Sequence, residues 1–253
     1  MSEILTPINQ NLQLIQNSRG LTFGSDSYLL SAYVSGSTRA RMADLGSGTG
    51  IISLLCASVN KFSTAYAIEI QESFADMIAR NVTLNSFEGK IIPICKDIRE
   101  VSAKDTDGEL DIAISNPPYM KADSGKRNQA DEKFIARHEV CGDIGDFCAC
   151  AARLLKHGGK FYTVWRPDRL CDLFVSLREN KLEPKRITFV CATPQSQPSM
   201  VLVQSTKGAA SGSVVTKSLL LHENIESAKK NVLSAEAKEI YDTCSFEQFF
   251  KNA

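Results

Sequence analysis

Residues 115–119, Ser-Asn-Pro-Pro-Tyr, have the side chains needed to make a poor nitrogen nucleophile reactive. An amide or exocyclic base nitrogen attacks slowly because its lone pair is delocalised. The Asn116 side-chain oxygen and a proline carbonyl can accept its two N–H hydrogens and so localise that lone pair. Pro117 and Pro118 keep the backbone rigid where misplacement by about 1 Å can cost 100-fold in rate, and Tyr119 offers a ring for stacking. We predict that these four residues are catalytic; a tight turn beside a core tyrosine is the alternative.

A glycine-rich sequence, Asp44 to Gly50 (D-L-G-S-G-T-G), lies between a predicted strand and a predicted helix. Glycines at such a position allow a tight turn and a close approach of a ligand to the backbone. The spacing is not the G-x-G-x-x-G of dinucleotide-binding loops, because Ile51 occupies the position of the last glycine. A loop of this type suits S-adenosylmethionine, which has no pyrophosphate to bind. A plain turn between strand and helix is the alternative.

Two acidic residues follow the next strands along the chain. Glu69 lies at the end of the predicted strand 64–70, where its carboxylate would accept hydrogen bonds from both ribose hydroxyls of the cofactor. Asp97 follows the predicted strand 91–95 and would accept from the adenine amino group, while Ile98 donates its backbone N–H. The alternatives are a solvated strand end for Glu69 and a helix cap for Asp97.

Strands and helices alternate along the chain as a parallel sheet requires. Apolar strands without alternation, connected by helices, predict a doubly wound α/β sheet of seven mostly parallel strands. Ligands of such sheets bind at the carboxyl ends of the strands, where the motifs above lie. We expect strands at residues 40–46, 64–70, 91–95, 110–115, 160–165, 186–191, 199–205 and 217–222, and helices at 26–34, 51–59, 72–85, 145–155, 168–179 and 235–244.

A short β-hairpin is predicted near the N-terminus, with residues 12–16 and 21–23 as its strands and a turn at 17–20. The chain has 253 residues, which is near the upper size of one α/β domain. We therefore expect one domain over residues 1–253, with a hairpin extension over 1–25 and a tail over 207–253 packed on it.

The composition is that of a globular protein, with 43% apolar residues, 23% charged residues and a net charge of zero. It excludes fibrous, coiled-coil and disordered classes, and no apolar run approaches the roughly 18 to 20 residues of a membrane-spanning helix. The N-terminal sequence lacks a secretory pattern, so we expect a cytoplasmic monomer with reduced cysteines. The spacing of Cys141, Cys148 and Cys150 fits no common zinc site, and we expect no metal.

Four segments, DLGSGTG, AIEI, KDI and SNPPYM, resemble in order and spacing the class I S-adenosylmethionine-dependent N-methyltransferases with an (N/D)PP(Y/F) motif. Within this class the chain is most similar to bacterial tRNA methyltransferases that modify N6 of adenine-37 in valine tRNA. The N-terminal hairpin, the segment LTFGSDSYLLSAYV and Arg137-His138-Glu139 carry that similarity, which covers roughly residues 10–205. It implies a Rossmann-like fold that binds S-adenosylmethionine. Motifs and resemblance together predict a cofactor site of Asp26, Asp44, Gly46, Gly48, Gly50, Glu69, Ile70, Asp97, Ile98 and Asn116.

Asp26 has an alternative role, because Ser25 or Asp26 could simply be the N-cap of the helix that follows.

A tRNA substrate requires positive charge near the target base. Residues 153–190 contain nine basic and four acidic side chains and could supply part of it. The loop after the Asn-Pro-Pro-Tyr motif is also basic, and we expect it to contact RNA phosphates; a solvated charged loop is the alternative. Its basic side chains are Lys121, Lys126, Arg127, Lys133 and Arg137.

The expected reaction is methylation of adenine N6 in tRNA, and two other functions stay open on the sequence. Protein glutamine N5-methyltransferases of the release-factor type use the same motif on an amide. They carry an extra N-terminal helical domain, whereas only about 40 residues precede the glycine-rich loop here. The other alternative is a non-catalytic RNA-binding protein that retains the cofactor pocket, which the intact residues Asn116 to Tyr119 argue against.

Overall fold

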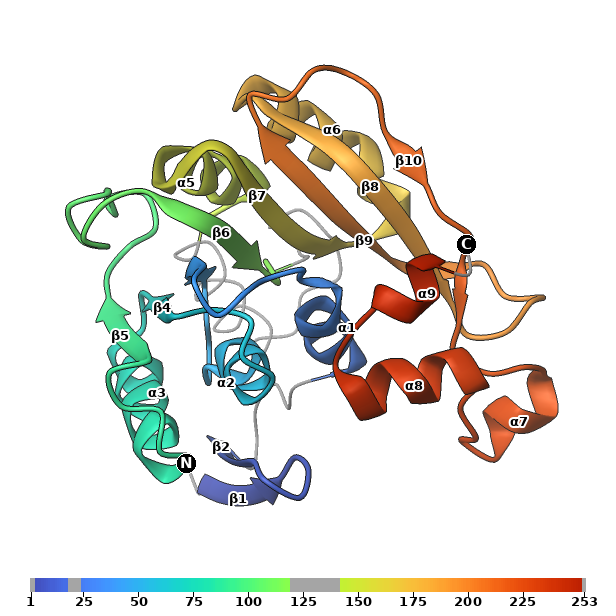
Figure 1. The fold of residues 1–253 in the computed structure, drawn as a ribbon. Coiled ribbons are helices and arrows are strands. Elements are labelled where there is room, and N and C mark those ends of the chain that lie inside the picture. The colour runs from blue at the N-terminus through green and yellow to red at the C-terminus, as the bar shows by residue number, and fades with distance from the viewer. Residues whose placement is uncertain (1–2, 18–23, 119–141, 252–253) are drawn as a thin grey trace, which may run out of the picture.

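The computed structural model describes residues 3–17, 24–118 and 142–251, in which nine strands form one large sheet (Figure 1). Their order is β10-β8-β9-β7-β6-β3-β4-β5, and β11 pairs with β8. The strands are β3 Arg41–Leu45, β4 Thr64–Glu69, β5 Ile91–Cys95, β6 Leu110–Ser115, β7 Leu155–Trp165, β8 Leu182–Cys191, β9 Pro198–Lys207, β10 Val214–Val215 and β11 Leu219–Leu220.

The seven longer strands form the predicted doubly wound sheet. Strands β5, β4, β3, β6 and β7 are parallel to their neighbours in that order, and β9 lies antiparallel between β7 and β8. Strands β10 and β11 have two residues each and add to the outer edge of β8. The α/β prediction is therefore confirmed, and the sheet has nine strands rather than the predicted seven. Strand β11 lies within the predicted strand 217–222, whereas β10 lies in no predicted strand.

Helices cover both faces of the sheet (Figure 1). Helices α1, α2, α3, α8 and α9 pack with one apolar cluster, whereas α5 and α6 pack with the other. The helices are α1 Ser25–Tyr33, α2 Ile51–Ser58, α3 Glu72–Leu84, α5 Ile144–Leu154, α6 Leu170–Glu179, α7 Ile225–Lys229, α8 Ala235–Thr243 and α9 Glu247–Lys251, with a 3₁₀ turn at Pro167–Arg169. None of the helices in these described ranges is both long and apolar enough to cross a membrane.

A β-hairpin lies near the N-terminus, as predicted, and includes a strand, β1 Glu3–Pro7, that the prediction lacked. Strand β2, Gln13–Asn17, is antiparallel to β1, which precedes it. The Asn9 side-chain oxygen accepts from the backbone N–H groups of Asn11 and Leu12, both at 2.9 Å, and so closes the turn. The predicted partner strand 21–23 and the predicted turn residues 18–20 lie outside the described residues.

Two asparagines of α3 hold the hairpin against the domain. Asn81 accepts from the Ile15 N–H at 2.7 Å and donates to its carbonyl at 3.0 Å. Asn85 makes the same pair of bonds with the backbone of Gln13, at 2.9 and 2.8 Å. Because the asparagines are four residues apart on the helix and their partners two apart on the strand, α3 takes the place of a neighbouring strand beside β2.

The described part of the tail, residues 207–251, packs on α1. The rings of Tyr28 in α1 and Tyr241 in α8 are stacked with their centroids 4.7 Å apart. The Tyr28 hydroxyl also donates to the Tyr241 carbonyl at 2.9 Å. The tail therefore supports the helix whose first turn lies at the site described below. The assignment of the whole chain to one domain stays a prediction.

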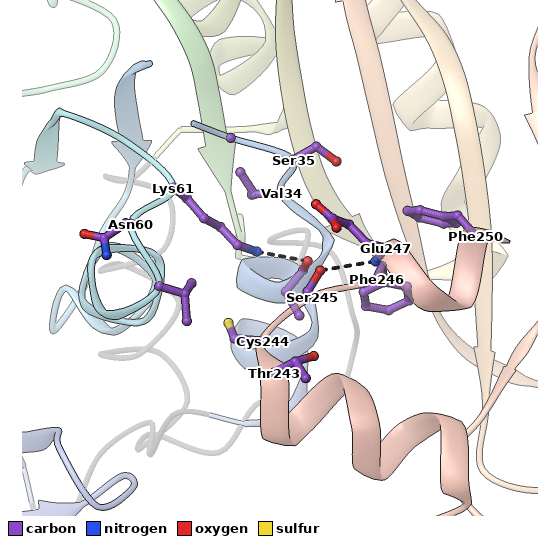
Figure 2. A pocket seen from close by; sticks show the side chains of 13 residues that line it. Val34, Ser35, Asn60, Lys61, Thr243, Cys244, Ser245, Phe246, Glu247 and Phe250 are labelled. Atoms are coloured by element: carbon purple, nitrogen blue, oxygen red, sulfur yellow. Dashed lines mark hydrogen bonds between the residues drawn. The ribbon is translucent and has the colours of Figure 1, made fainter. Parts of the chain in front are cut away.

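A buried lysine caps the carboxyl-terminal end of α1. The Lys61 side chain is only 8% exposed, and its ammonium donates to the carbonyls of Ser31 and Ala32 at 2.7 and 3.0 Å. Figure 2 shows this side chain beside a pocket of about 190 Å³ that the tail residues Thr243 to Phe246 help to line. Lys61 thus provides donors for helix carbonyls that have no partner within the helix.

Replacing Lys61 with methionine, which keeps the chain length and removes the donors, should lower the free energy of unfolding by about 1–3 kcal/mol, because two buried carbonyls lose the ammonium that donates to them. Urea denaturation measures this loss. Lys90→Met is the matched control, since Lys90 donates to the Ala57 carbonyl at 3.0 Å from a half-buried position. A loss for Lys61→Met no larger than that for the control would contradict the assignment.

Candidate active site

The predicted motifs meet where the strand order reverses. From β3 the sheet continues to β4 on one side and to β6 on the other, and all three strands are parallel. The glycine-rich loop follows β3, Asn116 follows β6, and Glu69 is the last residue of β4. This is the position at which doubly wound sheets bind their ligands.

The glycine-rich loop turns sharply over the end of β4. Gly46 and Gly48 have φ angles of +70° and +55°, a conformation that favours glycine. The N–H groups of Gly46 and Ser47 donate to the Ile68 carbonyl at 2.9 and 3.0 Å. A side chain at Gly46 would also lie 3.1 Å from the Phe147 ring. The loop therefore needs glycine for its backbone shape and for its contact with α5.

Glu69 fixes this loop from the neighbouring strand. Its carboxylate is 5% exposed and accepts from the Gly48 N–H at 2.9 Å and from the Gln71 N–H at 3.0 Å. A carboxylate has about four acceptor positions. Glu69 thus retains the capacity to accept from a ligand diol while it holds the loop.

Asp44 is a second buried carboxylate below the loop. One oxygen accepts from the Ser53 hydroxyl at 2.9 Å, and Oδ1 has no hydrogen-bond partner among the described residues. Burial, and to a smaller degree the charge of Glu69, raise the pKa of Asp44 to about 7, against the opposing effect of the Ser53 hydrogen bonds. Two buried carboxylates, one with an unused oxygen, fit a ligand that carries positive charge and a diol, as S-adenosylmethionine does.

The Asp97 carboxylate interacts with Arg99, two residues further along the chain. Its carboxylate accepts from the Arg99 backbone N–H at 2.9 Å and forms an ion pair with the Arg99 guanidinium, which lowers the pKa of Asp97. The Ile98 carbonyl accepts from Arg153 at 2.6 Å, which fixes the turn after β5. The carbonyl of Ile70 lies 3.9 Å from the Cys95 thiol. The cofactor roles of Asp97, Ile98 and Ile70 stay predictions.

Asn116 follows β6 directly and contacts the first turn of α1. Its amide nitrogen donates to Asp26 Oδ2 at 2.9 Å and to the Ser27 hydroxyl at 3.2 Å. The preceding residue, Ser115, donates to the Leu45 carbonyl at 2.8 Å and thereby ties the motif to β3. Pro117 is buried, and Tyr119 lies outside the described residues. The structure therefore brings Asp26 to Asn116, although 90 residues separate them in the sequence.

Asp26 is not the N-cap of α1. Gly24 occupies that position with no side-chain hydrogen bond, so the predicted cap at Ser25 or Asp26 is wrong. Both residues lie in the first helical turn instead. The carboxylate of Asp26 is directed to Asn116 and to the Ser27 backbone N–H, which it accepts at 2.8 Å.

A groove of about 550 Å³ adjoins Asp26 at the carboxyl end of β7. Its volume lies within the range of small-ligand pockets. Its wall combines apolar surfaces with charged groups and is lined by Gly24, Ser25, Asp26, Trp165, Arg166, Pro167, Asp168, Pro198, Ser199 and Met200. The groove thus reaches Asp26, the residue that accepts a hydrogen bond from Asn116.

The predicted RNA contacts are described only in part. Lys121, Lys126, Arg127, Lys133 and Arg137 lie outside the described residues. Within the basic segment 153–190, three arginines form local ion pairs: Arg166 with Asp168, Arg169 with Asp172 and Arg178 with Glu183, at 2.7–2.9 Å. The three acidic partners belong to the same segment and are already counted in its composition, so its excess of basic over acidic side chains remains.

The sequence interpretation missed Ser27, Ser53 and Asn81. Asn81 is fully buried and, besides holding β2, donates to the Thr49 carbonyl of the glycine-rich loop at 3.0 Å. It links the hairpin to that loop. Its position beside Met77, Ile78 and Val82, on the apolar face of a predicted helix, is the signal that could have identified it. Ser27 and Ser53 left no comparable signal.

In the parts of the chain that the structure describes, no three His, Cys, Asp or Glu side chains are grouped as a metal site requires. Cys148 and Cys150 are buried in α5, and Cys141 lies outside these parts.

Known proteins similar to this chain are methyltransferases. The family model of the methyltransferase small domain matches residues 22–173. A tRNA1(Val) (adenine(37)-N6)-methyltransferase from Bacteroides fragilis is 30% identical over 188 residues, 72% of this chain and 76% of the relative. An enzyme of the same name from Porphyromonas gingivalis is 27% identical over 215 residues, 82% of this chain and 84% of the relative.

Solved structures agree with the fold. A predicted O-methyltransferase from Agrobacterium tumefaciens superposes with a TM-score of 0.64 at 18% identity, over 83% of this chain and 97% of that structure. TYW2 from P. horikoshii, in complex with MeSAdo, has a TM-score of 0.57 at 13% identity, over 82% of this chain and 72% of that structure. The match of the family model spans more than half of the sequence and includes both the glycine-rich loop and Asn116, so the chain belongs to the methyltransferase small domain family.

Proposed function

We propose that this protein uses S-adenosylmethionine to methylate N6 of an adenine in tRNA, with position 37 of a valine tRNA as its target. The observation that carries the proposal is the placement of Asn116 at the end of β6, next to the loop fixed by Glu69. The names of the relatives from Bacteroides fragilis and Porphyromonas gingivalis support the same substrate.

The residues of the site have separate tasks in this reaction. Asp44, Glu69 and the glycine-rich loop bind and orient the cofactor, which supplies a methyl group activated by its sulfonium. The Asn116 side-chain oxygen and a proline carbonyl accept the N–H hydrogens of adenine N6 and direct its lone pair to the methyl group. These acceptors act most strongly as positive charge develops on N6, so they favour the transition state over the ground state.

The affinity for S-adenosylmethionine should rise about tenfold between pH 5.5 and pH 7.0, because one group with a pKa near 7 must ionise to hold a cationic ligand. The group is Asp44, whose pKa burial raises to about 7. Below that pH its carboxyl is protonated and offers no charge, so binding weakens as the pH falls. Calorimetry at both pH values measures the change.

The matched variant Asp44→Asn has no proton to lose. Its affinity should be lower at pH 7.0 and nearly independent of pH over the same range. A wild-type affinity that is equal at both pH values would contradict the role of Asp44.

Transfer of labelled methyl groups to defined acceptors tests the substrate. We expect label in an unmodified valine tRNA transcript and none in the same transcript with A37→G. A release-factor protein should stay unlabelled. Label in that protein, or equal labelling of both transcripts, would contradict the proposed substrate.

A further inference from the structure

We infer that Asp26 is a positioning residue for Asn116: its carboxylate selects the orientation in which the Asn116 amide oxygen faces the substrate nitrogen, and it strengthens that oxygen as an acceptor. The inference rests on the proposed function, because it assigns the support of the residue that contacts the methyl-accepting nitrogen.

An asparagine amide has two ends of similar size and opposite hydrogen-bonding character. Only one orientation suits the proposed reaction, since an NH₂ group directed to adenine N6 would place donors against donors. Rotation of the Asn116 amide by half a turn would therefore remove its catalytic effect. Some neighbouring group has to distinguish the two ends.

The first turn of α1 makes this distinction. An ionised carboxylate only accepts hydrogen bonds, so Asp26 Oδ2, at 2.9 Å from Asn116 Nδ2, requires the NH₂ end on its side. The Ser27 hydroxyl accepts from the same nitrogen at 3.2 Å. Because the oxygen and nitrogen of an amide point in different directions from its carbon, Oδ1 is directed away from this pair.

The carboxylate is itself held in place. Asp26 Oδ1 accepts from the Ser27 backbone N–H at 2.8 Å, and the stacked pair Tyr28–Tyr241 fixes the same helix turn against the tail. A hydrogen bond to a charged acceptor is stronger than one to a neutral acceptor. It also polarises the amide, which places more negative charge on Oδ1.

Exchanging the two groups tests the inference. Asp26→Asn removes the charge and the selection, so kcat should fall about 10- to 100-fold, as it does when a residue that hydrogen-bonds and orients a metal ligand is lost. Asn116→Asp should lower kcat further, because two carboxylates then face each other. In the double variant Asp26→Asn/Asn116→Asp an amide again donates to a carboxylate, whose second oxygen faces N6. The double variant should therefore be at least tenfold more active than Asn116→Asp alone.

The direction in which Asp26→Asn changes the rate in the Asn116→Asp background separates a positioning role from a structural one. If Asp26 only stabilised α1, Asp26→Asn would lower the rate in both backgrounds, which would overturn the inference. A parallel loss of S-adenosylmethionine affinity in Asp26→Asn would overturn it too, since Asp26 would then bind the cofactor directly. The control is Asp76→Asn, which removes an exposed helix carboxylate paired with Arg80 and should leave kcat unchanged.

Two further measurements keep the outcomes distinct. Thermal unfolding of each variant shows whether it is folded, and Ser27→Ala, which removes only the weaker acceptor, should lower kcat less than Asp26→Asn does. The wild-type protein is measured in the same tRNA assay. No methylation by the wild type would overturn the proposed function, whereas wild-type methylation without rescue in the double variant would overturn only the role of Asp26.

Discussion

Asn116→Ala should lower the single-turnover rate of methyl transfer to tRNA by about 100- to 1000-fold, the usual cost of one preorganised contact to a developing charge. The affinities for S-adenosylmethionine and tRNA should change little, since the contact matters most in the transition state. Rapid-quench transfer from labelled cofactor measures the rate, and calorimetry measures the binding.

The control is Asn180→Ala, which removes an amide that donates to the Ser176 carbonyl at the end of α6. It should transfer methyl groups at the wild-type rate. If Asn116→Ala also kept that rate, the Asn-Pro-Pro segment would be only a turn after β6.

Glu69→Ala should weaken S-adenosylmethionine binding by about 1.5–3 kcal/mol, the range for hydrogen bonds to a charged group. That loss corresponds to about 10- to 150-fold in the dissociation constant. The structure adds a second reason, because the Glu69 carboxylate also holds the Gly48 N–H at 2.9 Å. Calorimetry on the folded variant gives the affinity.

Glu69→Gln retains one acceptor oxygen and should lose less affinity than Glu69→Ala. Glu183→Ala, which removes a strand carboxylate paired with Arg178, is the matched control and should bind the cofactor as the wild type does. Unchanged affinity of Glu69→Ala would contradict the assignment of the ribose site.

The parallel βα units could be predicted from the sequence because their signals are local. Strands β3, β4, β5 and β6 lie within one residue of the predicted ranges, since each is a short apolar run bounded by turn residues. Strand β7 begins at Leu155 rather than at residue 160, because Gly158 and Gly159 interrupt its apolar pattern. Strand β10 has only two residues, and so short a segment has no periodicity to detect, whereas β11 lies within the predicted strand 217–222.

The hairpin shows that a local pattern can predict a strand without indicating which parts of the chain pair with it. The alternation at residues 12–16 predicts the strand that the structure contains, whereas its neighbours in space, β1 and the side chains of Asn81 and Asn85, have no signal there. A helix that substitutes for a strand leaves no trace in the alternation of the strand itself.

The residues of the candidate site also fall into two groups, those with a local signal in the sequence and those without one. The glycine-rich loop, Glu69 and Asn116 were found because each follows a recognisable strand. The contact between Asp26 and Asn116 joins residues 90 positions apart, and no spacing rule connects them. The state of Asp44, buried with one oxygen lacking a partner among the described residues, likewise depends on packing.

The central claim is that adenine N6 in tRNA receives the methyl group. Mass spectrometry of nucleosides from unmodified valine tRNA, after incubation with the protein and S-adenosylmethionine, tests it most directly. We expect N6-methyladenosine, approaching one per tRNA with the wild type and nearly absent with Asn116→Ala. Unmethylated adenosine throughout, or a methyl group on another nucleoside, would contradict the claim.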